Sequence, residues 1–168
     1  MTEVTLRAAR RTDATTLAAM SRDLIETGLG WHYRAGRVER LLDDADTAGV
    51  VAVAAARIAG FAIMTLGADH AHFVLLAVRP AHRRQGIGRR VVEWMIATAA
   101  SAGVQSVHVE LRAGNRPAHA FYGALGFTET LRLDGYYAGR ETAIRMMRLL
   151  RRPGAVPEAW SPPTFDNR

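Results

Sequence analysis

The sequence of 168 residues contains no cysteine and no lysine. The absence of cysteine excludes disulfides, a thiolate nucleophile and zinc held by cysteine. The absence of lysine excludes a Walker-type phosphate loop, which requires the sequence Gly-x-x-x-x-Gly-Lys. All 22 basic residues are arginine, and with 16 acidic residues they give a formal net charge of +6. Any phosphate-binding loop in this chain must therefore be of another kind.

The chain also lacks a persuasive membrane segment. Residues 49–68 are nearly uncharged, but Arg57 lies in their middle and most of the others are alanine, glycine or valine. A central arginine costs about 2.5–3.5 kcal/mol on membrane-insertion scales, and such weakly apolar neighbours offset little of it. Two buried strands around a turn near residues 55–59 are the better interpretation. Residues 1–11 carry arginines but no apolar segment typical of a secretory signal, so we expect a cytoplasmic protein with no membrane partner.

The positive charge has two explanations. Either the chain binds a polyanion, such as nucleic acid or a phosphate-rich cofactor, or its arginines are solvated on helix faces. Arginines are concentrated only at residues 83–90 and 145–152. Aromatic residues that would stack on bases are not interleaved with them, so we do not expect nucleic acid as a direct ligand.

Length and apolar patterning predict one domain over residues 1–150 and a Pro-rich tail over 151–168, which holds four of the six prolines. The patterns predict, in order, a strand, two helices, three strands, a helix, a strand, a helix and two strands. Thr12 and Asp13 are expected to cap the first helix, and a loop over residues 135–137 is expected between the last two strands. This order indicates a mixed α/β or α+β sheet.

A segment rich in arginine and glycine, residues 83–90, lies between the apolar run 73–78 and the amphipathic stretch 91–99. A strand that enters a glycine-rich turn and continues as a helix leaves several backbone N–H groups unpaired, where the helix dipole is positive. Four arginines surround that point. The dinucleotide fingerprint is excluded because Val91 stands where its third glycine is required. The spacing Arg-x-x-Gly-x-Gly thus predicts a phosphate cradle of another type.

This spacing resembles the pyrophosphate-binding loop of the GNAT acetyltransferases. A second motif downstream is similar to the signature Asn-x-x-Ala-x-x-Phe/Leu-Tyr-x-x-x-Gly-Phe of the same family. Its residues here are Asn115, Ala118, Phe121, Tyr122, Gly126 and Phe127. The agreement extends over roughly residues 4–150. It implies a mixed, mostly antiparallel sheet with a central parallel β-α-β-α unit and helices on both faces, and acetyl-coenzyme A as co-substrate.

The sequence resembles one branch of that family in more detail, the ribosomal-protein N-alpha-acetyltransferases. Glu110 stands five residues before Asn115, and a Tyr-Tyr pair precedes the sequence Arg-Glu-x-Ala. The resemblance implies that Glu110 acts as general base and Tyr122 as general acid. It also implies that Tyr136 and Tyr137 line the peptide site.

The resemblance assigns further residues to the coenzyme. Backbone atoms of the strand before the cradle would hold the pantetheine arm, the cradle would hold the pyrophosphate, and an asparagine would contact the coenzyme side. The residues concerned are Leu76, Ala77, Val78, Arg83, Arg84, Gln85, Gly86, Ile87, Gly88, Arg89 and Asn115. We expect the acceptor site to be lined by the aromatic and glycine-rich segment 28–40, including Trp31.

Each of these side chains also has a simpler explanation. Glu110, taken alone, is an exposed charge on the polar face of a strand, and Tyr122 is a core residue at helical spacing. Tyr136 and Tyr137 fit the tip of a hairpin that packs on the sheet. Asn115 is a natural helix cap, a role compatible with coenzyme contact.

Two histidines, His70 and His72, share one face of an expected strand. Such spacing can indicate a metal site, but no third ligand of known geometry stands nearby. We therefore expect no metal.

Because a cysteine acyl-enzyme is excluded, the amine is expected to attack the thioester directly in a ternary complex. The amine must first be neutral. At pH 7 this costs about 4.6 kcal/mol for a lysine-like amine and about 1 kcal/mol for an α-amine. A single carboxylate suits the second task better, which favours a protein or peptide N-terminus as acceptor.

Two alternatives stay open. The first alternative to a peptide acceptor is an acetyltransferase for a small amine, such as an antibiotic, polyamine or amino acid. The second is a non-catalytic sensor of acyl-coenzyme A. The segment 28–40 contains no acidic cluster of the kind that a polycation would bind, although Asp43, Asp44 and Asp46 follow it. We expect a monomer or a homodimer.

Overall fold

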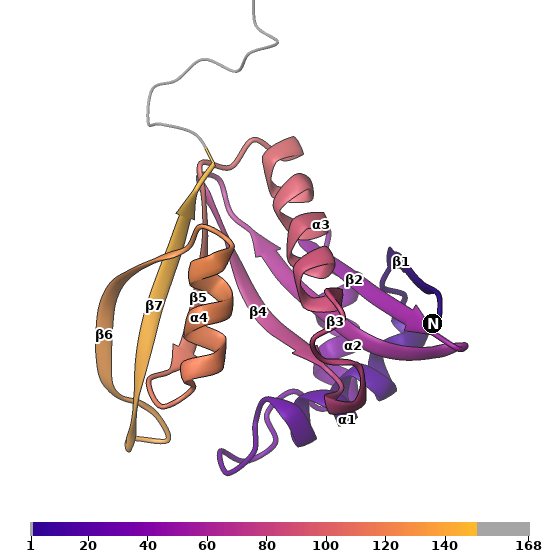
Figure 1. The fold of residues 1–168 in the computed structure, drawn as a ribbon, viewed down its shortest axis with the longest axis horizontal. Coiled ribbons are helices and arrows are strands. Elements are labelled where there is room, and N and C mark those ends of the chain that lie inside the picture. The colour runs from indigo at the N-terminus through magenta and orange to yellow at the C-terminus, as the bar shows by residue number, and fades with distance from the viewer. Residues whose placement is uncertain (1, 151–168) are drawn as a thin grey trace, which may run out of the picture.

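The computed structural model describes residues 2–150, which form seven strands and four α-helices in the predicted order (Figure 1). The strands are β1 (Val4–Ala8), β2 (Thr47–Ala54), β3 (Arg57–Leu66), β4 (His70–Val78), β5 (Ser106–Arg112), β6 (Thr128–Tyr137) and β7 (Glu141–Leu149). The helices are α1 (Ala14–Leu24), α2 (Ala35–Asp43), α3 (Ile87–Ser101) and α4 (Arg116–Ala124). The Pro-rich tail, together with Arg151 and Arg152 of the second arginine concentration, lies outside the described residues.

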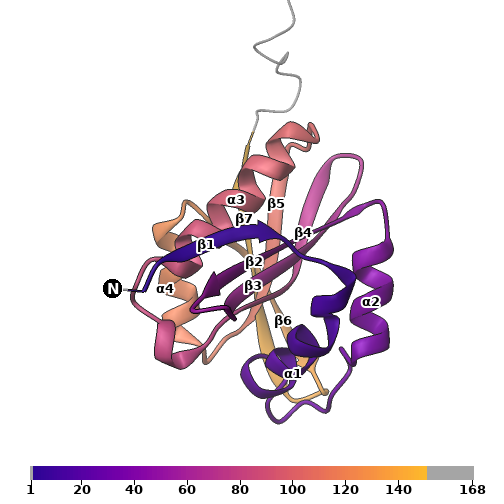
Figure 2. The same cartoon turned by 90° about the vertical axis from the view of Figure 1, so that its right-hand side faces the viewer.

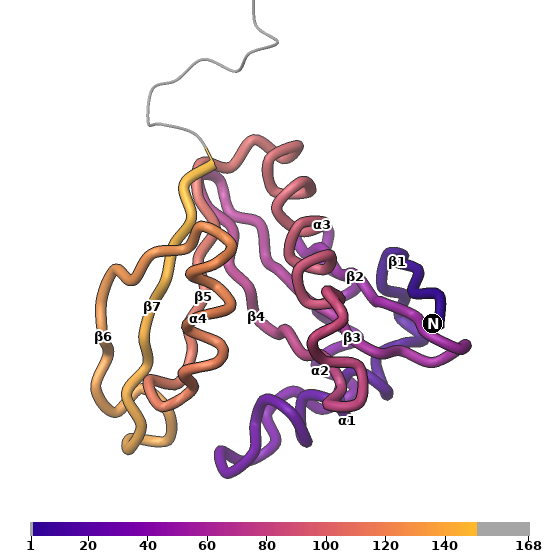
Figure 3. The backbone as a smooth tube through the Cα atoms, in the orientation of Figure 1, coloured from indigo at the N-terminus to yellow at the C-terminus, as the bar shows by residue number. Residues whose placement is uncertain are grey.

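One mixed sheet contains all seven strands in the order β1-β2-β3-β4-β5-β7-β6. Every neighbouring pair is antiparallel except β4 and β5, which are parallel, so the expected mixed, mostly antiparallel sheet with a central parallel unit is confirmed. The parallel pairing covers only residues 70–72 of β4, opposite residues 106–108 of β5. Beyond these residues the two backbones separate, as the tube in Figure 3 shows. The sheet is therefore split at its centre.

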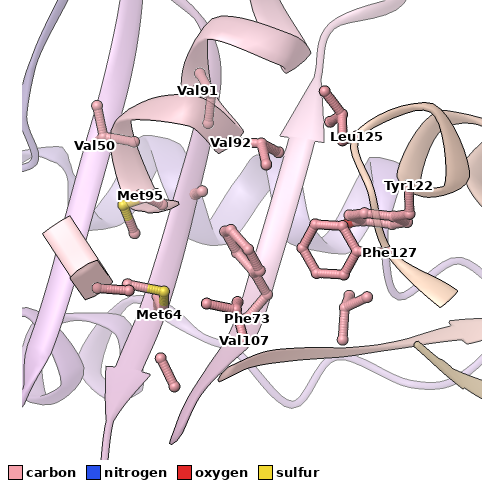
Figure 4. Packing of buried hydrophobic residues seen from close by; sticks show 14 of the residues in the cluster. Val50, Met64, Phe73, Val91, Val92, Met95, Val107, Tyr122, Leu125 and Phe127 are labelled. Carbon is pink, nitrogen blue, oxygen red and sulfur yellow. The ribbon is translucent and has the colours of Figure 1, made fainter. Parts of the chain in front are cut away.

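Helices cover both faces of the sheet (Figure 2). One core cluster joins the sheet to α3 and α4, and a second joins it to α1 and α2. Figure 4 shows the first cluster, in which Phe73 of β4 lies among Tyr122, Phe127 and the valines of α3.

The strand β4 changes face along its length. Ala71 and Phe73 belong to the core on the α3 side, whereas Leu75 and Ala77 belong to the core on the α1 side. Residues two apart in a regular strand share a face, so the change requires an irregularity. The register of β4 against β3 shifts at Val74, which has no partner between the pairs Ile63–Leu75 and Met64–Phe73. A β-bulge at Val74 thus turns the strand over.

The uncharged run 49–68 is a hairpin of β2 and β3, as predicted. Its turn places Ala55 at φ +48° and Ala56 at φ +62°, the left-handed pair that closes a tight two-residue hairpin. No helix within residues 2–150 combines the length and apolar character needed to cross a bilayer.

Two local predictions were wrong. The carboxylate of Asp13 does not cap α1; it accepts from Arg10 N–H at 2.7 Å and from both Nη atoms of Arg7 at 2.8 and 3.0 Å. This closes a 3-10 turn ahead of the helix, because the paired guanidinium orients the carboxylate toward β1. Tyr136 and Tyr137 do not lie in a loop, since β6 continues through them and the turn begins at Ala138, with φ +52°.

Candidate active site

The split between β4 and β5 opens into a cleft of about 580 Å³. Its walls come from β4, β5, α4, the end of β6 and the segment 24–33 that follows α1. Because the strands diverge here, the cleft passes between the two faces of the sheet.

The backbone of β4 faces this opening at alternate residues. Arg79 N–H donates to Ala59 O at 2.8 Å, so the backbone groups of residue 79 point to β3. In an antiparallel pair this orientation alternates, which directs Ala77 to β3 as well and leaves Leu76 and Val78 facing the split. Leu76 also lines the cleft. Of the three residues predicted to offer backbone atoms to the coenzyme, Ala77 is thus occupied by the sheet.

The predicted cradle forms the turn into α3. Arg84 has φ +60° and Gly86 has φ +77°, and Gly86 is the residue before the first helical one. Arg90 is the first residue after the turn whose backbone N–H is hydrogen-bonded to the turn, and it donates to Gly86 O at 3.1 Å. The six N–H groups of residues 84–89 donate to no acceptor in the described part of the chain. An anion placed here would meet several free donors at the positive end of a helix dipole.

The four arginines around this turn make different contacts in the structure. Three of them are directed elsewhere: Arg83 Nε donates to Val78 O at 3.1 Å, Arg89 Nε to Glu93 at 3.1 Å and Arg90 Nη1 to Val4 O at 3.0 Å. Only Arg84 makes no side-chain hydrogen bond or ion pair to the described residues. Because three of the four arginines are already hydrogen-bonded to other residues, the donors of the cradle that stay available are chiefly its backbone N–H groups.

The side chains of the cradle's other members point away from the N–H groups. Ile87 is buried in the core on the α3 side. A Cβ added to Gly88 would lie 3.2 Å from the Phe121 ring of α4, whereas one added to Gly86 would meet nothing within 4 Å. Gly88 thus permits a close helix contact, and Gly86 permits a positive φ.

Asn115 begins α4 as predicted, because its Oδ1 accepts from Ala118 N–H at 3.2 Å. It also lines the cleft. Tyr122, about two helical turns later, is 6% exposed and packs edge-on against Phe121 and Phe127. Burial raises the pKa of Tyr122, so its hydroxyl stays protonated and can donate.

Glu110 is not the exposed charge that its position alone suggested, since only 8% of its side chain is accessible. One carboxylate oxygen pairs with His72 Nε2 of β4, and the other accepts from Arg145 Nε of β7 at 2.8 Å. Burial raises the pKa of Glu110, but the hydrogen bonds from His72 and Arg145 and their charges outweigh it, so the pKa lies below its ordinary value.

Tyr136 and Tyr137 both line the cleft, with their rings edge-to-face at 5.0 Å. Burial, with smaller contributions from Tyr136 and Glu110, raises the pKa of Tyr137 to about 12. Across the cleft, Glu26 holds the segment after α1: it accepts from Ser21 Oγ at 2.9 Å and from His32 N–H at 2.7 Å.

The prediction for Trp31 differs from the structure. Its indole N–H donates to Ala18 O and Tyr33 O, both at 3.1 Å, and its ring contacts the guanidinium groups of Arg22 and Arg34. The cleft is lined instead by its neighbour Tyr33. Trp31 fixes the segment against α1, because its partly buried indole N–H needs an acceptor and finds it in the backbone.

Three residues of this site, His72, Arg145 and Glu26, were not predicted from the sequence as site residues. His72 was considered only as a metal ligand, and within residues 2–150 no group of three or more potential metal ligands occurs. Arg145 pairs with Glu110 because β5 and β7 are neighbours in register, which no local pattern reveals. Glu26 carried no signal, since its partners are backbone groups.

The site residues divide between the two faces of the sheet. Val107, Val109 and Leu111 belong to the core on the α3 side, so Glu110 projects to the α1 side. The cradle, Asn115 and Tyr122 belong to the α3 and α4 side. The cleft connects the two sets.

Comparisons with known proteins agree with this arrangement. A sequence model described as the Acetyltransferase (GNAT) family matches residues 17–127. The ribosomal protein bS18-alanine N-acetyltransferase of Escherichia coli (strain K12) is 40% identical over 93 residues, which are 54% of this chain and 63% of that protein. The match therefore spans less than two thirds of that relative.

Two solved structures are similar over most of the chain. The ribosomal-protein-S18-alanine N-acetyltransferase from Escherichia coli has a TM-score of 0.77 at 25% identity, covering 95% of this chain and 99% of that one. Arabidopsis thaliana NAA60 in complex with acetyl-CoA has a TM-score of 0.78 at 17% identity, covering 88% and 99%. The second likeness shows the fold alone.

Proposed function

Because the chain belongs to the GNAT acetyltransferase family, we propose that it transfers the acetyl group of acetyl-coenzyme A to a primary amine. The first choice of acceptor is the α-amine of a protein or peptide N-terminus. The observation that carries this proposal is the cleft through the split sheet, with a phosphate cradle on one face and a buried carboxylate on the other.

The coenzyme face fits the chemistry of acetyl-coenzyme A. The free N–H groups of residues 84–89 suit the diphosphate, which carries negative charge and needs several donors at once. The backbone groups of Leu76 and Val78 that face the split suit the amide-bearing pantetheine arm, as an added strand would. Asn115 lines the cleft beside them.

In the proposed reaction the neutral amine attacks the thioester carbonyl carbon directly, and the C–S bond breaks. Proton removal on the amine side takes place at Glu110 and the side chains bonded to it. Tyr122, protonated because burial raises its pKa, donates to the departing sulfur. An N–H group of β4 facing the split would stabilise the developing oxyanion.

The acceptor face favours a single amine over a polycation. Glu26 and Glu110 are the two carboxylates among the described residues that line the cleft, and both are engaged. Glu26 accepts from a hydroxyl and from backbone N–H groups, and Glu110 is paired with His72 and Arg145. A polyamine or aminoglycoside would find no free carboxylate there. The tyrosines 136 and 137 provide apolar edges suited to a peptide.

The proposal is tested by the release of free thiol from acetyl-coenzyme A with peptides of varied N-terminal residue and, in parallel, with small amines. Peptide turnover blocked by N-terminal acetylation supports the first choice, and turnover confined to small amines overturns it. Micromolar coenzyme binding without turnover of any amine would leave the sensor. Mass spectrometry of native proteins with the gene present and absent identifies the acceptor, and a cytoplasmic ribosomal protein is the expected kind.

A further inference from the structure

A histidine stands at the point where the sheet divides. His72 belongs to the last pair that joins β4 to β5, and its Nε2 bonds Glu110, two residues beyond its partner His108. Its side chain is 39% accessible and lines the cleft on the face of Glu110. The second ring nitrogen, Nδ1, has no partner among the described residues and is not among the buried atoms. His72 therefore offers one open nitrogen to the acceptor side.

Glu110, by contrast, has little left to offer. Both of its oxygens are engaged, by His72 and Arg145, and its side chain is nearly inaccessible. Its pKa is lowered, whereas an α-ammonium loses its proton near 7.8. A carboxylate of lowered pKa is a weak acceptor for that proton, and an imidazole is by its chemical class a stronger base than a carboxylate.

Resting on the function proposed above, we propose that His72 is the group that takes the proton from the acceptor amine, and that Glu110 is a positioning residue that holds His72. Nε2–H donates to Glu110, which fixes the tautomer with a lone pair on Nδ1. Arg145 in turn fixes Glu110. The open nitrogen, the buried carboxylate and the guanidinium form one chain from β4 through β5 to β7.

The step balances without any further reactant. The amine lone pair forms the C–N bond, the C–S bond breaks, and its electron pair leaves with the coenzyme sulfur. The amine proton passes to Nδ1 of His72, and the imidazolium is stabilised by Glu110 until water removes the proton. Tyr122 protonates the sulfur and regains a proton from water.

Several titratable groups face His72 and must be separated from it experimentally. They are Glu110 and His108 on β5, His70 on β4, Arg145 on β7, Tyr136 and Tyr137 on β6, and Glu26, His32 and Tyr33 across the cleft. Burial, with the charges of His70 and Arg145, lowers the pKa of His108, which favours the neutral form of that imidazole.

The test compares His72→Gln with the control His70→Gln, using a peptide acceptor whose amine is titrated separately. Glutamine retains an N–H for Glu110 but accepts no proton. We expect kcat/KM of His72→Gln to fall about 100-fold or more, the size of a general-base contribution. The acid limb due to an enzyme imidazole should disappear from its pH profile. His70→Gln, outside the cleft lining, should stay within threefold of the wild type.

A second variant separates proton transfer from positioning. His72→Ala removes a side chain that is partly accessible and leaves an open space in its place. Added imidazoles should enter that space and restore turnover, and the restored rate should increase with the basicity of the imidazole. Retained activity in His72→Gln, or a loss with an unchanged pH profile and no rescue, overturns the inference and leaves the proposed function intact. Coenzyme affinity, measured on the other face, should be unchanged and reports folding. A wild type inactive with every amine would overturn the proposed function and this inference with it.

Discussion

The substitution Gly86→Ala tests the cradle where its geometry is most demanding. Gly86 has φ +77°, a backbone conformation that only glycine adopts freely, and a Cβ added there meets nothing within 4 Å. The change therefore introduces backbone strain without a steric clash. In the free protein the turn either keeps its conformation under strain or relaxes to a negative φ, which moves the N–H groups of residues 84–89 away from a common point.

The magnitude follows from the left-handed conformation, which costs an alanine about 1–2 kcal/mol. If the turn keeps its shape, this cost lowers the free energy of unfolding by about 1–2 kcal/mol, and coenzyme affinity is retained. If the turn relaxes, stability is retained and binding must restore the strained shape. The same 1–2 kcal/mol then raises the Kd of coenzyme A by a factor of about 5–30. The loss of unfolding free energy and the loss of coenzyme-binding free energy should therefore add up to about 1–2 kcal/mol, the cost of the left-handed alanine.

Two measurements on each variant provide the assay: urea unfolding for the free energy and calorimetry with coenzyme A for Kd. Gly123→Ala is the matched control, because Gly123 lies exposed in α4, has no neighbour within 4 Å of an added Cβ and has no positive φ. It should gain up to about 1 kcal/mol from helix propensity and bind coenzyme A normally. Unchanged stability together with unchanged Kd in Gly86→Ala would refute the assignment of the cradle.

Three further changes probe other parts of the molecule. Asp13→Asn should lower the free energy of unfolding at pH 7 by about 2 kcal/mol, because the bidentate pair with Arg7 is lost. The pKa of Asp13 is lowered in the folded state, chiefly by the Arg7 hydrogen bond, so the wild-type advantage is present above about pH 4 and lost as the pH falls below it. Urea unfolding of both proteins at pH 7 and pH 3 checks this. Tyr122→Phe should lower kcat about tenfold or more with unchanged coenzyme Kd, since it removes only a proton donor; an unaltered kcat would exclude that role. Gly88→Ala should displace the Phe121 ring, 3.2 Å from the new Cβ, and weaken coenzyme binding while stability changes by less than about 1 kcal/mol.

The order of the elements was predictable because it depends on local patterns. Gly103 and Gly126, which follow the ends of α3 and α4, both have positive φ in the structure, and Asn115 caps α4 as its side chain allows. The mixed sheet followed from this order. Such signals lie within a few residues of one another, so a single sequence contains them completely.

Contacts set by strand register were not predictable in the same way. The burial of β4 alternates without interruption along its length, so the pattern alone places His72 and Leu76 on one face. The bulge at Val74 places them on opposite faces, and the sequence contains no glycine or proline there that would mark it. The pairing of Glu110 with His72 and Arg145 likewise depends on three strands that are distant in the chain. Trp31 was misplaced for a related reason: its acceptors are backbone carbonyls.

The bulge also explains how β4 would contact both substrates of the proposed reaction. The proposed reaction removes a proton from the amine and delivers one to the sulfur, and these groups approach from opposite faces of the sheet. Without Val74 as an extra residue, β4 would be a regular strand with His72 and Leu76 on the same face. The extra residue shifts the strand by one position, which moves every later side chain to the other face. With it, β4 presents His72 beside Glu110 on the α1 side, and Leu76 and Val78 to the α3 side, within nine residues. In the proposed reaction, the separation of proton removal from coenzyme binding is thus a consequence of one unpaired residue, Val74.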